Sequence, residues 1–153
     1  MSDDIAFGIS LPCDDDGFIL LQCEYCGSFF KITAENVEDD QLLNIYCPSC
    51  GLVSADYLTE DVLALSQTML QNFAMDLIYD AFKGLERETR NKSVQFKAGK
   101  KPKHENENPI KSGIEALDIT NFECCMRTAK IKPLLKMTGC YCPFCGVKEY
   151  ETK

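Results

Sequence analysis

The sequence predicts a small α+β protein in which a long amphipathic helix and a basic linker join two cysteine-rich β modules. Two observations on composition and one on periodicity support this fold class. The 153 residues include ten cysteines, five within residues 1–58 and five within residues 114–153. Between these clusters, residues 59–85 repeat apolar side chains at helical spacing. Residues 86–113 are polar and rich in Lys, Asn and Pro.

The first β module, residues 1–58, is predicted from two short apolar runs on either side of a cysteine turn. Gly17–Gln22 has the composition of a strand that leads into Cys23, and Ser28–Ile32 has that of a strand leaving Cys26. The acidic stretch Asp14–Gly17 is a turn signal ahead of the first strand. We therefore expect a hairpin whose tip carries two thiols.

Cysteine spacing in this module indicates a metal site. Cys23 and Cys26 form one Cys-x-x-Cys pair, and Cys47 and Cys50 form a second after twenty intervening residues. Each such turn directs two thiolates to one point, so two turns supply the four ligands of a zinc tetrahedron. The protein fills all four positions, which favours a structural role. Rubredoxin-type iron and a thioredoxin-like redox pair are the alternatives, although the βαβ pattern of a redox fold is absent.

The predicted helix spans residues 59–85. Thr59 suits the N-cap, and Glu60 and Asp61 are favourable in the first turn. Its apolar residues form two adjoining stripes, one made of Val62, Leu65, Met69, Phe73, Leu77, Ala81 and Leu85, the other of Leu63, Leu70, Ala74, Ile78 and Phe82. A helix this long and apolar needs a packing partner: the second module, a second copy of the chain, or another protein.

The linker, residues 86–113, is strongly basic in its first part. It is expected to be flexible, with His104 as a surface side chain. One interpretation is an arm that contacts nucleic-acid phosphates; the other is a solvated linker whose charge offsets the acidic N-terminal half. The candidate nucleic-acid-binding residues are Arg87, Arg90, Lys92, Lys97, Lys100, Lys101 and Lys103.

The second β module, residues 114–153, repeats part of the first. Its Cys142-Pro-Phe-Cys145 turn matches the Cys-Pro-Ser-Cys turn of the first module, and Cys124 and Cys125 stand earlier in the segment. Cys125, Cys142 and Cys145 are the firmest ligands of a second site. Cys124 is the favoured fourth ligand, Cys140 is the alternative, and a degenerate site that binds no metal stays open.

An internal alignment explains this irregularity. Placing Lys31 over Lys130 puts Cys26 over Cys125, but it puts Phe122 where the first cysteine of the pair is expected. The same alignment gives Cys140 an apolar strand position, which favours a core thiol. The expected composition is therefore two Zn²⁺ ions per chain, with the second site less regular than the first.

Both clusters resemble zinc ribbons, the rubredoxin-like knuckle fold of transcription-factor-type ribbons. The resemblance covers about residues 18–53 and 118–150. It implies a binding module that docks on protein, contacts nucleic acid, or does both. Because each ribbon is too small to fold by burial alone, we expect metal to supply much of its folding free energy.

Charge is distributed unevenly along the chain. The net charge is −8, with fifteen acidic residues against Lys31 alone in residues 1–80, and a basic balance after them. The N-terminal half should therefore repel nucleic acid, whereas the C-terminal half permits its binding. The acidic N-terminus does not have the pattern of a signal peptide, and no long apolar run occurs, so we expect a cytoplasmic protein with reduced thiols.

No pattern in the sequence indicates catalysis. There is no glycine-rich phosphate loop, nucleophile elbow or Cys/His nucleophile pair. The sequence favours a non-enzymatic adaptor or accessory subunit that docks on a protein partner or self-associates through the 59–85 helix. Its setting would be a larger assembly, such as a nucleic-acid-processing one. The alternatives are a DNA- or RNA-binding protein acting through the basic half, and a redox or metal-buffering protein. No membrane or small-molecule partner is expected.

Overall fold

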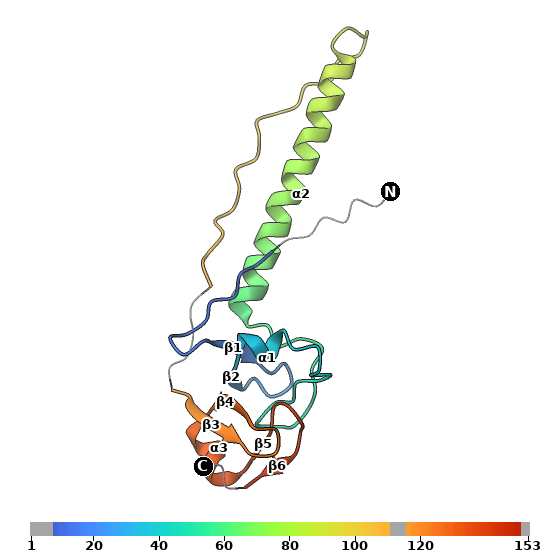
Figure 1. Cartoon of the computed structure of the whole chain (residues 1–153). Helices are drawn as coiled ribbons and strands as arrows, with labels where there is room; N and C mark the ends of the chain where they lie inside the picture. Colours follow the sequence, from blue (N-terminus) through green and yellow to red (C-terminus); the bar gives the residue numbers. More distant parts are fainter. Residues whose placement is uncertain (1–7, 111–115, 151–153) are drawn as a thin grey trace. The chain divides into compact units, whose positions relative to one another are not determined.

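The computed structural model describes residues 8–110 and 116–150, which belong to two compact units (Figure 1). One unit, here called the sheet unit, combines Met1–Thr59 with Ile110–Lys153; the helical unit is Glu60–Pro109. Both cysteine-rich segments therefore lie in a single unit, whereas the sequence suggested two separate modules. None of the helices among the described residues has the length and apolarity needed to cross a membrane.

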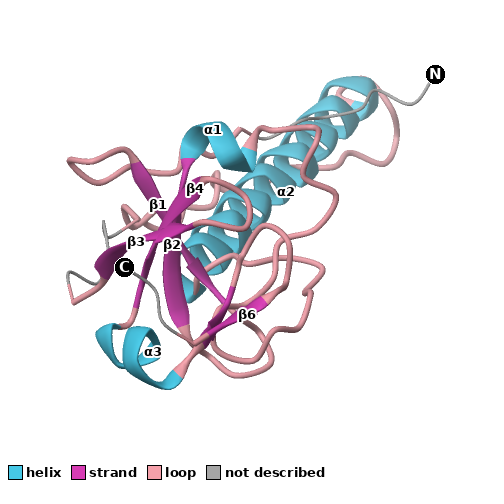
Figure 2. Cartoon of the chain, turned by 60° about the horizontal axis from the view of Figure 1, so that its bottom comes forward, coloured by secondary structure: helices cyan, strands magenta, loops and turns pink. Residues whose placement is uncertain are grey.

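The sheet unit is built on four antiparallel strands. In spatial order they are β1 (Phe18–Gln22), β2 (Phe29–Thr33), β4 (Arg127–Ile131) and β3 (Asp118–Phe122). Each cysteine-rich segment contributes one hairpin, and β2 pairs with β4 to join the hairpins. The smaller elements are α1 (Ala34–Val37), α3 (Pro133–Thr138) and the short pair β5 (Cys140–Tyr141) and β6 (Lys148–Glu149). Figure 2 shows α1 and α3, and Figure 1 shows β5 beside β6.

The strand register shows an internal two-fold repeat. Leu20 pairs with Lys31 in the first hairpin, and Ile119 pairs with Lys130 in the second. Residues of β1 thus have their counterparts in or beside β3, and residues of β2 have theirs in or beside β4, 99 positions later in the chain. This is the offset of the sequence alignment. Lys31 also faces Lys130 across the β2–β4 pair. Because β2 and β4 run antiparallel, this pairing places an approximate two-fold axis between the hairpins.

One core serves both halves of the sheet unit. Phe30 and Ile32 of β2 are buried on the same face as Ala129 and Ile131 of β4, as the alternation of side chains along a strand requires. Phe122 lies in the same cluster with no exposed surface. A single hairpin offers too few apolar residues to fill a core, so the two halves complete one another.

Lys31 and Lys130 occupy the opposite face of the sheet, where both pair with Asp14. The Asp14 Oδ2 atom accepts hydrogen bonds from Lys31 Nζ at 3.1 Å and Lys130 Nζ at 2.7 Å, and Lys130 also donates to Asp16 at 2.7 Å. Although partial burial opposes it, bonding to Lys130, to the Phe18 N–H and to Lys31 holds the pKa of Asp14 well below its usual range. The acidic turn thus fastens the N-terminal segment to the centre of the sheet.

The helical unit consists of α2 (Glu60–Thr89) and the chain that follows it. At 30 residues, α2 extends four residues past the end expected from periodicity and measures about 45 Å. The Thr89 hydroxyl donates to the Leu85 carbonyl at 2.9 Å and accepts the Phe96 N–H at 2.9 Å, which turns the chain back. Residues 92–109 then run along the helix in extended form (Figure 1).

Specific contacts hold this returning segment, which the sequence suggested would be a flexible linker. The buried Asn72 amide donates to the Glu105 carbonyl at 3.0 Å and accepts the Glu105 N–H at 2.9 Å. His104 Nε2 lies 2.8 Å from Asp76 Oδ1, and the Phe82 and Phe96 rings are 5.6 Å apart. An asparagine side chain presents the same donor and acceptor as a peptide group, so it pairs with an extended backbone as a strand would.

Candidate metal centres

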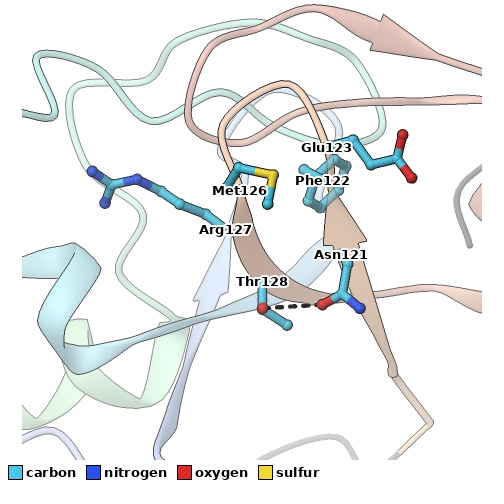
Figure 3. A pocket seen from close by; sticks show the side chains of 6 residues that line it. All are labelled: Asn121, Phe122, Glu123, Met126, Arg127 and Thr128. Carbon is cyan, nitrogen blue, oxygen red and sulfur yellow. Dashed lines mark hydrogen bonds between the residues drawn. The ribbon is translucent and has the colours of Figure 1, made fainter.

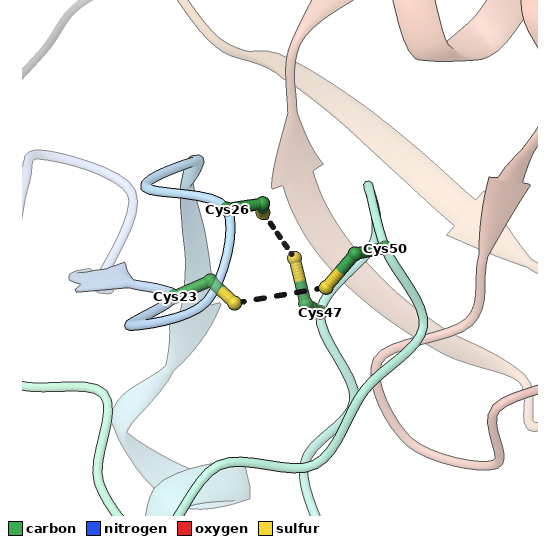
Figure 4. A group of neighbouring side chains, drawn as sticks. All are labelled: Cys23, Cys26, Cys47 and Cys50. Carbon is green, nitrogen blue, oxygen red and sulfur yellow. Dashed lines mark hydrogen bonds between the residues drawn. The ribbon is translucent and has the colours of Figure 1, made fainter.

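Four sulfur atoms converge in the first site (Figure 4). Cys23 and Cys26 come from the β1–β2 turn, and Cys47 and Cys50 come from the turn after α1. The Sγ atoms lie within 4.8 Å of one another, with Cys23 3.7 Å from Cys50 and Cys26 3.5 Å from Cys47. Bonds of about 2.3 Å to a central ion would give sulfur separations of about 3.8 Å, whereas a disulfide needs about 2.05 Å. The spacing fits an ion and excludes disulfides.

Both turns of the first site share one backbone arrangement. The Cys47 N–H donates to the Leu52 carbonyl at 3.0 Å, and the Gly51 N–H donates to the Cys47 carbonyl at 2.8 Å. The corresponding bonds in the other turn join Cys23 to Ser28 and Gly27 to Cys23, at 3.0 and 2.9 Å. Gly27 and Gly51 both have φ of +72°, a conformation that glycine adopts without steric cost.

Backbone and hydroxyl groups favour thiolate at one position of the first site. Burial opposes ionisation, but hydrogen bonds from the Ser28 backbone and side chain lower the pKa of Cys26 to about 7. Burial raises the pKa of Cys47 well above its usual range. Without a cation, burial therefore keeps Cys47 as a neutral thiol, whereas a divalent cation at the centre would keep all four thiols ionised.

The second site brings together Cys124, Cys125, Cys142 and Cys145. Their Sγ atoms also lie within 4.8 Å, with Cys145 3.3 Å from Cys124 and Cys142 3.7 Å from Cys125. Cys140, the alternative fourth ligand, is fully buried in β5 and does not belong to this group. Burial raises the pKa of Cys142 to about 12 and that of Cys125 to about 11, so both are neutral thiols unless a bound cation stabilises their thiolates.

A core side chain explains the irregular spacing of the second site. Phe122 occupies the position that corresponds to Cys23, and its ring packs edge-on against Phe144 with centroids 6.4 Å apart. Cys124, which corresponds to the exposed Tyr25, supplies a sulfur instead. Met126 has a φ of +54°, the only positive value among the described residues other than glycine. The turn therefore keeps the left-handed conformation that Gly27 provides in the first site.

The two sites are in direct contact through their second turns. The Tyr46 N–H donates to the Pro143 carbonyl at 2.8 Å, and the Tyr141 N–H donates to the Pro48 carbonyl at 2.9 Å. Each bond thus joins the residue before one Cys-Pro turn to the proline of the other. A shared Tyr-Cys-Pro motif in the two modules was the sequence signal for this exchange, and the alignment of the cysteines alone missed it.

A pocket beside the second site is formed by the end of the β3–β4 hairpin (Figure 3). Its lining residues are Asn121, Phe122, Glu123, Met126, Arg127 and Thr128. The Thr128 hydroxyl and Asn121 Oδ1 are hydrogen-bonded at 3.1 Å, and the Arg127 guanidinium points away from the other lining residues to bind Asn36 and Asp39. The polar groups of the pocket mainly serve the fold, and we assign no reaction to it.

The basic residues divide into neutralised and exposed groups. On the sheet unit, Arg127 pairs with Asp39 at 2.8 Å, Lys130 with Asp14, and Lys136 lies 3.9 Å from Asp118. Six of the seven linker candidates are exposed and form no ion pair with any residue that the structure describes, while Lys101 lies 3.4 Å from Asp76. The six are Arg87, Arg90, Lys92, Lys97, Lys100 and Lys103.

Comparison of the chain with protein-family models, with curated proteins and with solved structures finds no match. The function therefore has to be inferred from the chemistry of the chain's own residues.

Proposed function

We propose that the protein is a non-enzymatic adaptor whose sheet unit binds two structural Zn²⁺ ions and whose helical unit docks a protein partner. The observation that supports this most directly is the pair of complete four-cysteine groups. With four protein ligands around each ion, no position is left for water or substrate, which is the arrangement of structural rather than catalytic zinc.

The donor set favours zinc or iron over hard cations. Four sulfurs in a tetrahedral arrangement suit Zn²⁺ or iron and exclude the hard cations Mg²⁺ and Ca²⁺. Four thiolates and one divalent ion carry a net charge of −2, and hydrogen bonds from the turn backbones would offset part of it. Holding the turns together would be the ion's contribution, because each turn has few apolar contacts of its own.

The docking surface is an apolar stripe on α2. Between Asp61 and Asp76 the helix carries no charged residue. The returning segment is anchored at Asn72, which lies two and a half turns from Leu63 and so on the opposite side of the helix. Five large apolar side chains on the remaining side are 42–55% exposed: Leu63, Leu70, Leu77, Ile78 and Leu85. An apolar surface of this length is typical of a protein-binding face.

Metal analysis of the purified chain tests the first half of the proposal. We expect two zinc ions per chain, one in the Cys124→Ser variant, and two in the Cys140→Ser variant, because Cys140 lies outside the sulfur group. Cys140→Ser is a matched control, since it removes a buried thiol without removing a ligand. A wild-type chain that contains no zinc and takes up none after reduction would overturn the proposal.

The docking half is tested by substitution on the stripe. Leu70→Asp combined with Leu77→Asp should abolish self-association in light scattering, or the capture of specific proteins from native lysate, because charges would replace buried apolar contacts. Asp80→Ser, an exposed polar position on the same helix, is the control and should leave both unchanged. A wild-type chain that is strictly monomeric and captures no protein would contradict this role.

Nucleic-acid binding is the second candidate, favoured by the six exposed cations between Arg87 and Lys103. A gel-shift experiment at ~50 mM salt tests it, because counterion release makes such binding fall steeply with added salt. The triple variant Lys97→Ala, Lys100→Ala, Lys103→Ala should weaken binding uniformly across sequences. Absence of any shift with DNA and with RNA would remove this candidate.

The third candidate, redox or metal buffering, requires zinc that exchanges freely under native conditions.

A further inference from the structure

The second turns of the two sites exchange their tyrosine rings as well as backbone hydrogen bonds. A Cβ atom placed on Gly51 would lie 2.8 Å from the Tyr141 ring, and one placed on Gly146 would lie 2.9 Å from the Tyr46 ring. Both glycines have positive φ, +72° and +76°. Each turn therefore forms a seat for the aromatic ring that precedes the other turn, and only glycine leaves room for that ring.

We propose that the two metal sites load cooperatively, with this tyrosine exchange as the coupling element; the inference rests on the proposed metal binding. Tyr141 contacts two residues of the first site's second turn: its N–H donates to the Pro48 carbonyl, and its ring lies against Gly51. Pro48 lies between Cys47 and Cys50, and Gly51 follows Cys50. A metal ion that fixes the first turn therefore also fixes the seat of Tyr141. Tyr141 directly precedes Cys142 in the chain. Metal binding at the first site therefore also positions Cys142, a ligand of the second site.

The coupling runs equally in the other direction. Metal bound by Cys142 and Cys145 fixes Pro143 and Gly146, which receive Tyr46, the neighbour of Cys47. Reciprocity is a thermodynamic requirement for any linkage between two binding sites. The shared core strengthens it, because Cys142 packs in the same buried cluster as residues of the first hairpin.

Titration of the reduced, metal-free chain with Co²⁺ tests the proposal, since thiolate-bound Co²⁺ reports each tetrahedral site by its absorption. In the wild type, the half-loaded species should be a minor one. The variant Cys26→Ser with Cys47→Ser should bind one Co²⁺ at the second site at least tenfold more weakly than the wild type does, within the usual range of coupling between sites. Cys124→Ser with Cys145→Ser should weaken the first site comparably. Cys13→Ser, an exposed cysteine outside both groups, is the control and should change neither.

A second pair of variants separates the tyrosine exchange from a general effect of folding. Tyr46→Ala with Tyr141→Ala keeps all eight ligands, so it should still bind two Co²⁺ ions while the half-loaded species becomes abundant. Tyr79→Ala, which removes a tyrosine from the helical unit, should behave as the wild type. If the double alanine variant does not fold with metal, the single variant Tyr46→Leu is expected to show the same shift on a smaller scale.

The outcomes distinguish this inference from the proposed function. If the wild type binds no Co²⁺ and no Zn²⁺, the metal-binding function fails and the inference fails with it. If it binds two ions whose affinities do not change when the other site is removed, or when both tyrosines are removed, only the coupling is overturned.

Discussion

The two four-cysteine groups occupy equivalent positions in a repeated hairpin, yet their sulfurs come from different positions. In the first group, Cys23 and Cys26 both contribute a sulfur and are separated by two residues. In the second, Phe122 takes the place of the first cysteine, and the adjacent Cys124 and Cys125 contribute the sulfurs. The strand register is the same in both halves, so a turn of this kind can replace a cysteine by a core side chain when a neighbouring residue supplies the missing sulfur.

This exchange changes what holds each turn in place. The turn between β1 and β2 has a thiol at its base, whereas the turn between β3 and β4 is also anchored by the buried Phe122 ring against Phe144. The first site should therefore depend more on its metal, and the second more on apolar packing. Each of the following predictions tests that contrast.

Metal removal should have the largest effect. A structural zinc site contributes on the order of 10 kcal/mol or more to folding, so a chelator at neutral pH should unfold much of the sheet unit. Hydrogen exchange should rise over residues 18–53 and 118–149 together, because the two halves share one core, but the metal-free chain should keep more protection over residues 118–149, where the aromatic anchor remains. Equal residual protection in both segments would remove the contrast between the sites.

Truncation of the aromatic anchor should come next. Phe122→Ala should lower the free energy of unfolding of the metal-loaded chain by about 3–5 kcal/mol, because it opens a cavity in a fully buried position. The variant should still bind two metal ions, since Phe122 is no ligand. Denaturant unfolding with metal analysis gives both quantities, and Val94→Ala, an exposed position in the helical unit, is the control. A loss below 1 kcal/mol would show that packing does not hold this turn.

Replacing the turn glycines by alanine should lower stability by smaller amounts, which differ between the three positions. Gly27→Ala should lower stability by about 1–2 kcal/mol, because only its positive φ opposes a side chain and no atom lies within 4 Å of the added Cβ. Gly51→Ala and Gly146→Ala should cost about 1–3 kcal/mol more, since the methyl group would also strike a tyrosine ring. Thermal unfolding of the loaded chains ranks the three, and equal losses would show that the rings move aside freely.

Asp14→Asn should have the smallest effect, and it depends on pH. Because the folded-state pKa of Asp14 lies well below its usual value of 3.8, the stability that its ionised form contributes is present above about pH 4 and is lost as the pH falls toward the depressed pKa. We expect the variant to be less stable by about 1–2 kcal/mol at pH 7, with the difference nearly constant down to about pH 4 and shrinking as the pH falls further. A difference that stays constant from about pH 5 to about pH 2 would contradict an ionic contact to Lys31 and Lys130.

Local patterns in the sequence were sufficient for several elements. The spacing of Cys23, Cys26, Cys47 and Cys50 predicts their convergence, because ligand geometry is encoded in short turns. Apolar periodicity identifies α2 to within one residue at its start. Alignment of Lys31 with Lys130 anticipates the strand register, since equal residues fill equivalent positions in a repeat.

Long-range pairing could not be read from the same patterns. The β2–β4 contact joins strands that are separated by the whole helical unit, and no local signal specifies which strand edges meet. The return of residues 92–109 along α2 was missed for a related reason. Asn72 resembles an ordinary polar residue within an apolar helix, and its function as a partner for the Glu105 backbone becomes visible only when the distant segment is in place.

The β2–β4 pairing can form only late in the synthesis of the chain. All four sulfurs of the first site are available once residue 50 is made, but the strand that completes the sheet follows roughly 80 residues later, which at about 5–20 residues per second is a delay of several seconds. During that interval β2 is an uncovered strand edge, and such edges readily pair with other chains. Lys31, in the middle of β2, is the kind of charged side chain that discourages such pairing, until β4 covers this edge and Lys130 comes to lie opposite Lys31.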